Sequence, residues 1–311
     1  KLDGVTVQEN DVLLNITGDS VARVCLAEAK YLPARVNQHV AIIRPNPEKL
    51  DSRFLRYFLA SPFQQDVMLG LAAVGATRNA LTKVMIENFK VPCPPIIVQS
   101  RIAEILGSLD DRIALLRETN ATLEAIAQAL FKSWFVDFDR NEWVHCELGD
   151  ITLITAGGDR PSKYTNKKTI ECHVPIYSNG IDNEGLYGYT DVAKIHEESI
   201  TISARGTIGY CCLRFKPYLP IVRLISVTPK IQNQIVFFYQ AIKNLVFENS
   251  GSVQQQLTVP QVSELKIVLP PEFYLTKFEK IGILLFSKIE NIKQQNQELA
   301  KLRDWLLPML M

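Results

Sequence analysis

Three short motifs carry the residue types that could do chemistry. The sequences EAK at 28–30 and ELK at 264–266 match half of the carboxylate and lysine set with which many nucleases bind Mg²⁺ and activate water. No second acidic motif stands at a suitable distance before either, so both are interpreted as solvated surface pairs. The turn PCPP at 92–95 lacks the polar residue that amino-methyltransferases place before two prolines. The chain also has no phosphate loop, HExxH pair or GxSxG elbow, so no catalytic residue is predicted.

The six cysteines could bind a metal or form disulfides. They show neither a CxxC spacing nor a dense framework: Cys25, Cys93, Cys146, Cys172, Cys211 and Cys212. Zinc is the alternative that the neighbouring His145 and His173 raise, but the usual ligand spacing is missing. We therefore predict no metal site, and reduced thiols in a cytoplasmic protein.

One segment of the sequence is repeated. Residues 75–95 (GATRNALTKVMIENFKVPCPP) and 251–271 (GSVQQQLTVPQVSELKIVLPP) align without a gap, 176 positions apart. The two copies share Gly, Leu-Thr, Lys and Pro-Pro at matching places. A duplication of this length predicts two copies of one structural unit.

A long helix is predicted after each Pro-Pro pair, because apolar residues recur there at alternating spacings of four and three. The first seam contains Ile102, Leu106, Leu109, Ile113, Leu116, Asn120, Leu123, Ala127, Leu130 and Trp134. The second contains Phe278, Gly282, Leu285, Ile289, Ile292, Asn296, Leu299, Arg303, Leu306 and Leu310. An apolar stripe needs a partner, so we expect the helices to pair as an antiparallel coiled coil about a pseudo-twofold axis. Arg303 interrupts its seam, and its stem is expected to lie along the edge.

Asn120 and Asn296 take equivalent seam positions near the midpoints of the two helices. A single polar seam residue fixes helix register at some cost in stability, which makes both candidates for that role. The alternative is that both amides face solvent at a slightly shifted seam. Further apolar residues flank the seams and predict a second docking face: Ile105, Leu115, Ile126, Phe131, Phe135, Ile281 and Leu284.

The segments before the helices predict α+β domains. Short β-rich runs end at Gly18 and Gly206, and each is followed by another β-rich run and a short amphipathic helix. The predicted fold is therefore two domains of mixed sheets and short helices, separated by the two long helices. The domain boundaries are expected at 1–95, 96–143, 144–270 and 271–311, the second and fourth of these segments being the long helices.

The two copies are unequal at their starts. The second unit opens about 55 residues before its strand at 199–206, whereas the first has only ten residues before its own. The chain also begins without Met. We therefore expect a fragment in which roughly 45 residues of the first domain are missing.

The composition is that of an ordinary soluble protein. The 311 residues are 47% hydrophobic and 22% charged, with no apolar run of 18 residues, so no membrane helix is predicted. The net charge of +1 argues against an extended basic surface, so any contact with nucleic acid must be a local patch.

The order of these segments resembles the specificity subunit of type I restriction–modification systems. The likeness is carried by ELGDITLITAGGDRPSK, VPIYSNGIDNEG, ITISARGTIGYCC, VNQHVAIIRP and the two Leu-Thr…Pro-Pro stretches, over essentially the whole chain. The resemblance implies two target-recognition domains, each of which reads one half of a bipartite DNA sequence. It also implies that the antiparallel helices set the spacing and dock two methyltransferase subunits, and that motor-nuclease subunits complete the enzyme. S-adenosylmethionine, ATP and Mg²⁺ are then expected only in those partner subunits.

The resemblance also assigns candidate DNA-binding residues. Arg and Lys suit phosphate or guanine, and Asn and Gln suit adenine. In the second domain the candidates are Arg160, Ser162, Lys163, Tyr177, Ser178, Asn179, Arg205, Thr207, Gln254, Gln255 and Gln256. In the first they are Thr17, Asn37, Gln38, Arg78 and Asn79. The alternative for each is a plain turn or surface role, and Asn37, Gln38 and Gln254 could instead support the backbone.

Two other functions remain open. One is the recognition part of a single-chain restriction–methylation enzyme, which a methyltransferase motif in upstream sequence would reveal. The other is a non-catalytic helical scaffold or antirestriction protein that uses the helices alone. A DNA mimic would be strongly acidic, and a net charge of +1 does not favour it.

Overall fold

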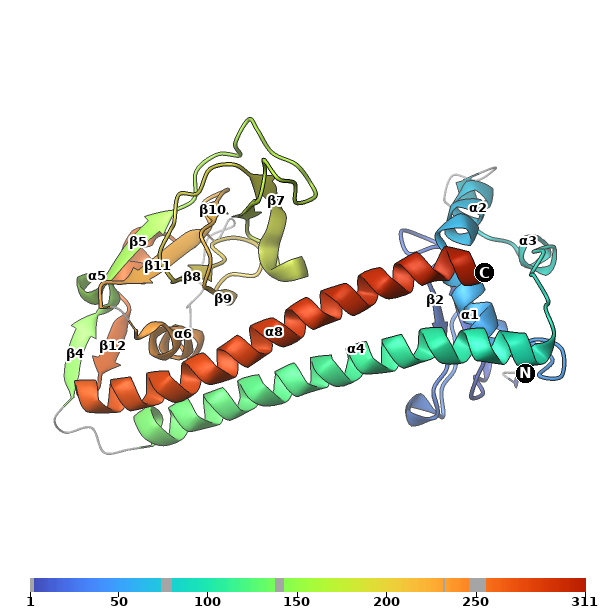
Figure 1. The fold of residues 1–311 in the computed structure, drawn as a ribbon, viewed down its shortest axis with the longest axis horizontal. Coiled ribbons are helices and arrows are strands. Elements are labelled where there is room, and N and C mark those ends of the chain that lie inside the picture. The colour runs from blue at the N-terminus through green and yellow to red at the C-terminus, as the bar shows by residue number, and fades with distance from the viewer. Residues whose placement is uncertain (1–2, 74–79, 138–142, 232, 246–255) are drawn as a thin grey trace. The chain divides into compact units, whose positions relative to one another are not determined.

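Two long helices and several small sheets make up the described residues of the computed structural model, which are 3–73, 80–137, 143–231, 233–245 and 256–311. The chain divides into unit 1 (residues 1–120 and 291–311) and unit 2 (residues 121–290). The long helices α4 (Ile96–Phe131) and α8 (Glu272–Leu310) each contribute residues to both units (Figure 1). Neither these nor any other described helix combines the length and the apolar character needed to cross a membrane.

Unit 1 is built on one antiparallel sheet of order β2-β1-β3. Its strands are β1 (Val12–Asn15), β2 (Val24–Leu26) and β3 (Val40–Ile43), and its helices are α1 (Ser52–Ala60), α2 (Pro62–Ala73), α3 (Lys83–Glu87) and the 3₁₀ turns η1 (Asp3–Val5) and η2 (Ala29–Tyr31). Alternate residues of β1, Val12 and Leu14, are fully buried in one cluster with Leu55 and Leu59 of α1. The period of two along the strand therefore gives the sheet one core face.

The described residues of unit 2 form three small sheets, of orders β5-β11-β8-β9, β10-β6-β7 and β12-β4. Its strands are β4 (Val144–Glu147), β5 (Thr152–Ala156), β6 (Val174–Tyr177), β7 (Leu186–Thr190), β8 (Ser199–Ile202), β9 (Cys211–Arg214), β10 (Leu219–Pro220), β11 (Ile225–Pro229) and β12 (Lys266–Leu269). Its helical elements are η3 (a π-helical turn, Lys132–Val136), α5 (Leu148–Ile151), η4 (Asp182–Gly185), α6 (Ile235–Lys243) and α7 (Val259–Ser263). Strands β10 and β6 pair in parallel and the other described strands antiparallel, so the sheet β10-β6-β7 is mixed and the others are antiparallel.

The core of unit 2 joins its main sheet to the long helices. Phe131 and Phe135, at the end of α4 and in η3, pack against Phe278 of α8 with ring centroids 6.0 and 5.0 Å away. Phe237 of α6 contacts the same two rings of α4 and η3. Phe131 and Phe135 were predicted to line a docking face; the structure instead buries them in this core because α6 covers them.

The repeated Leu-Thr pair has the same role in both units. The amide of Leu81 donates to the carbonyl of Ile16 after β1, and that of Leu257 donates to Ala204 after β8. The following Thr82 and Thr258 are the N-caps of α3 and α7, accepting hydrogen bonds from backbone amides in the first turn. The duplication therefore preserves a strand end and a helix start.

The long helices are in contact and antiparallel, as predicted. In unit 1, Leu106 of α4 packs with Leu307 of α8. One turn further along α4, Asp110 binds Arg303, which lies one turn earlier on α8. Every predicted seam position is buried or half-buried. Arg303 does not lie along the edge only, because its guanidinium crosses to Asp110 at 2.7 Å. The side-chain oxygens of Asn120 and Asn296 are buried, so these amides do not face solvent; their role in register stays a prediction.

Candidate nucleic-acid interface

Four loops of unit 2 meet beside the ends of its strands. The amides of Val222 and Arg223 donate to the carbonyls of Gly158 and Gly157 at 2.8 and 3.1 Å. A side chain at Gly157 would lie 2.7 Å from the backbone of Pro220, so only glycine allows this approach. We call residues 157–160, 178–181, 204–207 and 221–223 the loop cluster.

Asn179 ties three of these loops together. Its Nδ2 donates to the carbonyl of Val222 at 2.6 Å, and its Oδ1 accepts from the amide of Ala204 at 2.7 Å. Both bonds are to backbone, so this candidate holds the loop cluster in shape. Ser178 beside it makes backbone bonds to Gly180 and Gly185.

Arg205 projects from the loop cluster. Its Nε and Nη2 donate to Oε1 of Gln256 at 3.0 and 2.6 Å, and the arginine is exposed. This pair brings together two candidates 51 positions apart in sequence. A guanidinium pre-oriented by an amide has two N–H groups aligned for a guanine edge or a phosphate.

Arg160 is held by two tyrosines. Its Nη1 donates to the hydroxyls of Tyr164 and Tyr187, both at 3.1 Å, and its guanidinium lies 4.7 Å from the centroid of the Tyr164 ring. The hydrogen bond from Arg160 lowers the pKa of Tyr187. The stack fixes an exposed cation at the rim of the loop cluster.

Lys163 forms exposed ion pairs. Its ammonium lies 3.1 Å from Asp191 and 3.3 Å from Glu171. Hydrogen bonds to Asp191 and Glu171 raise the pKa of Lys163. Exposed pairs of this kind are weak, so a phosphate could replace either carboxylate.

The remaining candidates of unit 2 differ in exposure. Ser162 and Thr207 are exposed, and Thr207 belongs to the loop cluster. Tyr177 points into the unit: the guanidinium of Arg214 lies 3.6 Å from its ring centroid, and Tyr218 packs edge-on against it. Burial raises the pKa of Tyr177. Arg78, Asn79, Gln254 and Gln255 lie outside the described residues.

The candidates of unit 1 surround His39. Thr17 Oγ1 lies 2.6 Å from His39 Nδ1, Asn37 Oδ1 accepts from the His39 amide at 3.0 Å, and Gln38 Nε2 lies 3.5 Å from His39 Nε2. Asn37 thus supports the backbone, as the alternative for that residue stated. All three nevertheless lie in one group beside the strand ends.

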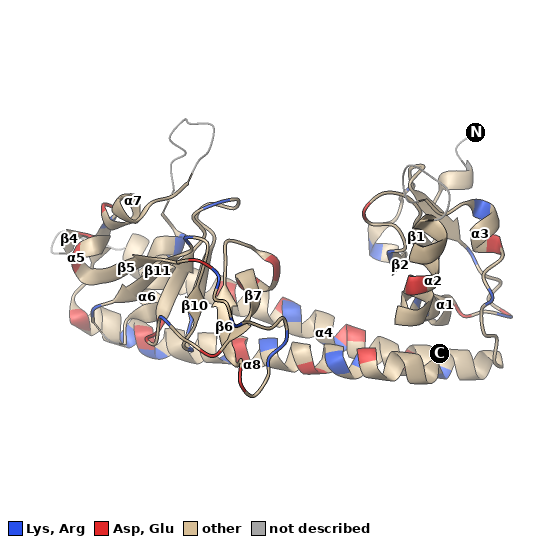
Figure 2. Ribbon diagram, turned by 90° about the horizontal axis from the view of Figure 1, so that it is seen from above, with Lys and Arg blue, Asp and Glu red and all other residues tan. Residues whose placement is uncertain are grey.

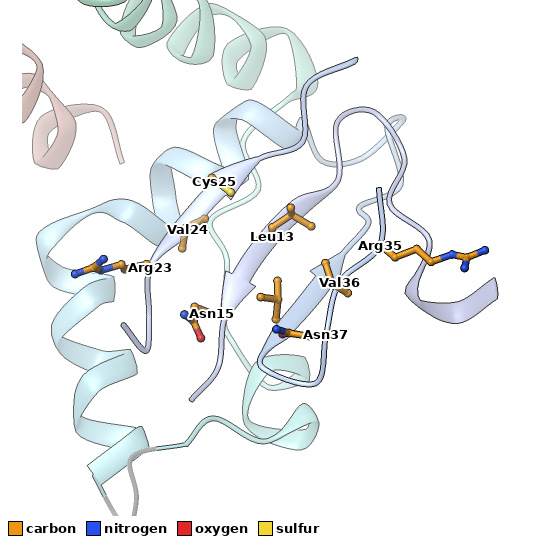
Figure 3. Close-up of a pocket in the computed structure, with 9 residues that line it drawn as sticks. Leu13, Asn15, Arg23, Val24, Cys25, Arg35, Val36 and Asn37 are labelled. Atoms are coloured by element: carbon orange, nitrogen blue, oxygen red, sulfur yellow. The ribbon is translucent and has the colours of Figure 1, made fainter. Parts of the chain in front are cut away.

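The sheet of unit 1 has a hollow next to this group. Its volume is about 350 Å³, and Figure 3 shows its lining side chains projecting from β1, β2 and the loop that follows η2. It is lined by Leu13, Asn15, Arg23, Val24, Cys25, Arg35, Val36, Asn37 and Val40.

The geometry adds Arg223, Tyr164 and Tyr187 to the candidates, which sequence reasoning did not include. Val222 and Arg223 adopt left-handed backbone at φ 52° and 60°, which β-branched and long side chains rarely do. No sequence signal marks that turn, because neither residue is one that favours it. Such backbone gathers at binding sites, where the surrounding contacts offset its cost.

The charges of the long helices do not form a basic face. Figure 2 shows Lys and Arg interspersed with Asp and Glu along α4 and α8. Within the described part of the chain, no three His, Cys, Asp or Glu side chains are grouped so that they could hold a metal ion. What the loop cluster offers chemically is hydrogen-bond donors, not a reacting group.

Comparison with known proteins identifies the family. The model of the type I restriction modification DNA specificity domain matches residues 1–125 and 140–301. The chain belongs to this family. It is the DNA specificity subunit of a type I restriction–modification system, a non-catalytic subunit for which no cofactor is expected.

Individual relatives agree. A type I specificity subunit of Mycoplasma pneumoniae is 29% identical over 283 residues, which cover 84% of this chain and 74% of that protein. The specificity subunit of the Methanocaldococcus jannaschii enzyme MjaIX is 25% identical, covering 89% and 72%. The crystal structure of the S subunit from M. genitalium superposes with a TM-score of 0.63 at 22% identity, covering 99% of this chain and 84% of that one. This likeness supports the α+β fold with two long helices.

Proposed function

We propose that each unit reads one half of a bipartite DNA target and that the loop cluster is the DNA-reading surface of unit 2. The supporting observation is that Arg160, Arg205 and Arg223 are exposed on the loop cluster, whose loops are joined by the side chain of Asn179 and by the backbone bonds of residues 222–223 to residues 157–158. Guanidinium groups can bind a guanine edge bidentately, and loops held by backbone bonds present them in a fixed arrangement. In unit 1 we propose Thr17, Asn37, Gln38, Arg78 and Asn79 for the same role. Ser162, Lys163, Tyr177, Ser178, Thr207, Gln254, Gln255 and Gln256 stay predictions for unit 2.

Methylome sequencing of a host that carries the gene with its methyltransferase partner tests this proposal. We expect one two-part methylated motif. Arg205→Ala should relax one position of one half-site and cost about 1–3 kcal/mol in binding. Lys230 is a matched control, because it is exposed and bonds to the carbonyls of Gly149 and Asp150, away from the loop cluster. Equal motifs for Arg205→Ala, Lys230→Ala and the unmodified chain would place the reading surface elsewhere.

We propose two methyltransferase subunits as partners on α4 and α8, with motor-nuclease subunits in the complete enzyme. S-adenosylmethionine, ATP and Mg²⁺ would be bound by those partners, and the site of action would be the cytoplasm, where chromosomal DNA lies in the relatives' cells. Support comes from apolar side chains exposed on the helices: Ile105 48%, Leu115 53%, Ile126 44% and Leu284 71%. Light scattering of a co-expressed complex should give two methyltransferase subunits per chain. A single one at saturation would contradict this.

The long helices are proposed to set the half-site spacing. Asp110 lies against Arg303, and continuing that register places Asn120 opposite Lys293. Inserting one heptad after Asn120 and one after Ile292 keeps the seams in phase and adds about 10 Å at 1.5 Å per residue. The spacer should then grow by at most about three base pairs at 3.4 Å each. A four-residue insertion in the exposed turn after Lys216 is the control and should leave it unchanged. An active heptad variant with the original spacer would refute the measuring role.

We also propose the domain boundaries 1–95, 96–143, 144–270 and 271–311, with a first domain completed by further sequence. In unit 2 the sheet β5-β11-β8-β9 has four strands. Among the described residues of unit 1, strands β3, β1 and β2 correspond to β11, β8 and β9, and no strand corresponds to β5. Thr201 of β8 is buried, but the equivalent Leu13 borders the open hollow. The missing segment is thus supported by the open face of the unit 1 sheet and by the edge of β3, where a counterpart of β5 would pair. Sequencing the gene upstream of the codon for Lys1 tests it.

A further inference from the structure

Ile170 has 98% of its surface exposed, more than any other large apolar side chain among the described residues. It stands in the sequence NKKTIE, within the segment that joins Tyr164 to β6. Its sequence neighbours Thr169 and Glu171 are exposed and polar, so Ile170 is a single apolar side chain within its own segment. A protein-docking surface would need a contiguous apolar patch, which this segment does not supply.

The turn that carries Ile170 is held by hydrogen bonds. The amide of Thr169 donates to the carbonyl of Cys172, and the Cys172 amide donates to Thr169 Oγ1, both at 2.9 Å. Thr165 is bonded to Tyr189 of β7 through both backbone groups, at 2.9 and 2.8 Å. Cys172 is 2% exposed and anchors the far end. Ile170 is therefore displayed by a constrained turn, residues 165–172, and does not lie on a loose loop.

Positive charge lies on the N-terminal side of Ile170. Lys167 and Lys168 precede Ile170 and are exposed. Arg160 of the loop cluster contacts the ring and hydroxyl of Tyr164, the residue just before the turn. The turn is therefore connected to the loop cluster. Glu171 is paired with Lys163 at 3.3 Å. An apolar tip preceded by two exposed lysines, with the following carboxylate paired to Lys163, matches a polyanion with an apolar interior.

Duplex DNA is such a partner, since phosphates line its outside and stacked bases its inside. Proteins that insert Ile, Leu, Phe or Met between base pairs partly unstack them and kink the duplex by about 20–90°. We propose that Ile170 is inserted between two adjacent base pairs of the bound target while Lys167 and Lys168 contact the flanking phosphates. This proposal rests on the proposed function and adds a DNA-deforming residue to it.

The test uses the full chain co-expressed with methyltransferase subunits and a duplex that carries the motif found by methylome sequencing. Energy transfer between dyes at the duplex ends reports the bend, and a titration over salt concentration reports affinity. Ile170→Ala should reduce the bend by about 20° or more and weaken binding about tenfold, with an unchanged salt slope because no charge is lost. Ile170→Leu should retain both. Lys168→Ala should instead reduce the salt slope by about one. Leu153→Ala, which removes a side chain 59% exposed on β5, is the control and should behave as the unmodified chain.

The outcomes separate the two proposals. An unmodified complex that leaves the duplex straight, or Ile170→Ala with unchanged bend and affinity, overturns the wedge and leaves the proposed function standing. Ile170→Ala that weakens only methyltransferase assembly also overturns it. A complex that does not bind the motif duplex overturns the proposed function and the wedge with it.

Discussion

Replacing Asp110 by alanine should loosen the helix pair of unit 1. Asp110 accepts hydrogen bonds from Tyr57 and Arg56 of α1, both at 2.8 Å, and from Arg303 of α8 at 2.7 Å. One carboxylate therefore joins α1, α4 and α8. Its side chain is 23% exposed, and both arginines are 29% exposed, so water screens these pairs only in part.

The cost of Asp110→Ala follows from what remains behind. Two partly buried guanidinium groups and one buried hydroxyl lose this acceptor, and Arg303 keeps its ion pair with Asp304. Breaking a fully buried pair costs about 3–5 kcal/mol, and leaving a buried donor unsatisfied costs about 1–3 kcal/mol. With the partial exposure of this cluster we expect about 2–3 kcal/mol. That corresponds to opening about 30- to 150-fold more often.

Hydrogen exchange with mass spectrometry measures this locally. Peptides covering residues 104–114 and 299–308 should exchange about 30- to 150-fold faster in Asp110→Ala, whereas peptides of β8 and β11 in unit 2 should not change. Glu104→Ala is the matched control. Glu104 lies on the same helix, 3.9 Å from Arg101, and that pair is 80% and 69% exposed, so its loss should change exchange less than about threefold. A change below threefold for Asp110→Ala would refute the reasoning.

The pH dependence of the effect has a definite sign. Burial works to raise the pKa of Asp110, but the hydrogen bonds from Arg303, Arg56 and Tyr57 outweigh it and lower the pKa. A carboxyl with a lowered pKa stabilises the fold above its unfolded pKa of about 3.9, and that stability is lost as pH falls through the folded pKa. The difference between Asp110→Ala and the unmodified chain should therefore be constant above about pH 5 and shrink below pH 4.

Three further predictions concern unit 2, the first with a matched variant in unit 1. Gly282→Ala should lower the free energy of unfolding, measured in urea, by about 1–3 kcal/mol, because the added Cβ would lie 2.6 Å from Val236. Gly107→Ala, whose added Cβ would have its nearest neighbouring atom at 3.8 Å, should leave that free energy unchanged or raise it by up to about 1 kcal/mol. Burial raises the pKa of Glu279, so its contribution to the free energy of unfolding is largest below about pH 4.3 and falls as pH rises through the folded pKa. Glu279→Gln should make the free energy of unfolding depend less on pH in that range. Asn179→Ala should weaken binding to the motif duplex about tenfold while circular dichroism stays unchanged, because the residue orders loops and not the core.

The α+β class, the two long helices and their seams could be predicted because their signals are periodic. Spacings of three and four, and the offset of 176 positions, hold over long windows and survive local exceptions. The identity of single contacts could not be predicted in this way. The sequence shows Arg303 only as a charged residue in an apolar seam, because its partner Asp110 is 193 positions away and outside the seam.

The role of each candidate site residue could not be predicted from the sequence, for a physical reason. Polar types in turns can serve either the backbone or a ligand, and sequence does not separate the two uses. Asn37 and Asn179 both bond to backbone, whereas Arg205 projects outward. Ile170 gave no signal at all, because an apolar residue in a loop is usually buried and only the fold exposes it.

The two ends of the helix pair use the duplicated sequence differently. Shifted by 176 positions, Asp110 corresponds to Phe286 and Arg303 to Ala127. The duplication therefore matches an ion pair in unit 1 with an aromatic and a small residue, both buried, in unit 2. If the two helices slipped or exchanged ends, a carboxylate or guanidinium would enter the apolar core of unit 2 without a partner, which costs several kcal/mol. The polar pair adds little net stability where it is, but it makes the wrong pairing costly. We infer that this asymmetry, more than the shared seam, gives the duplicated helices one arrangement.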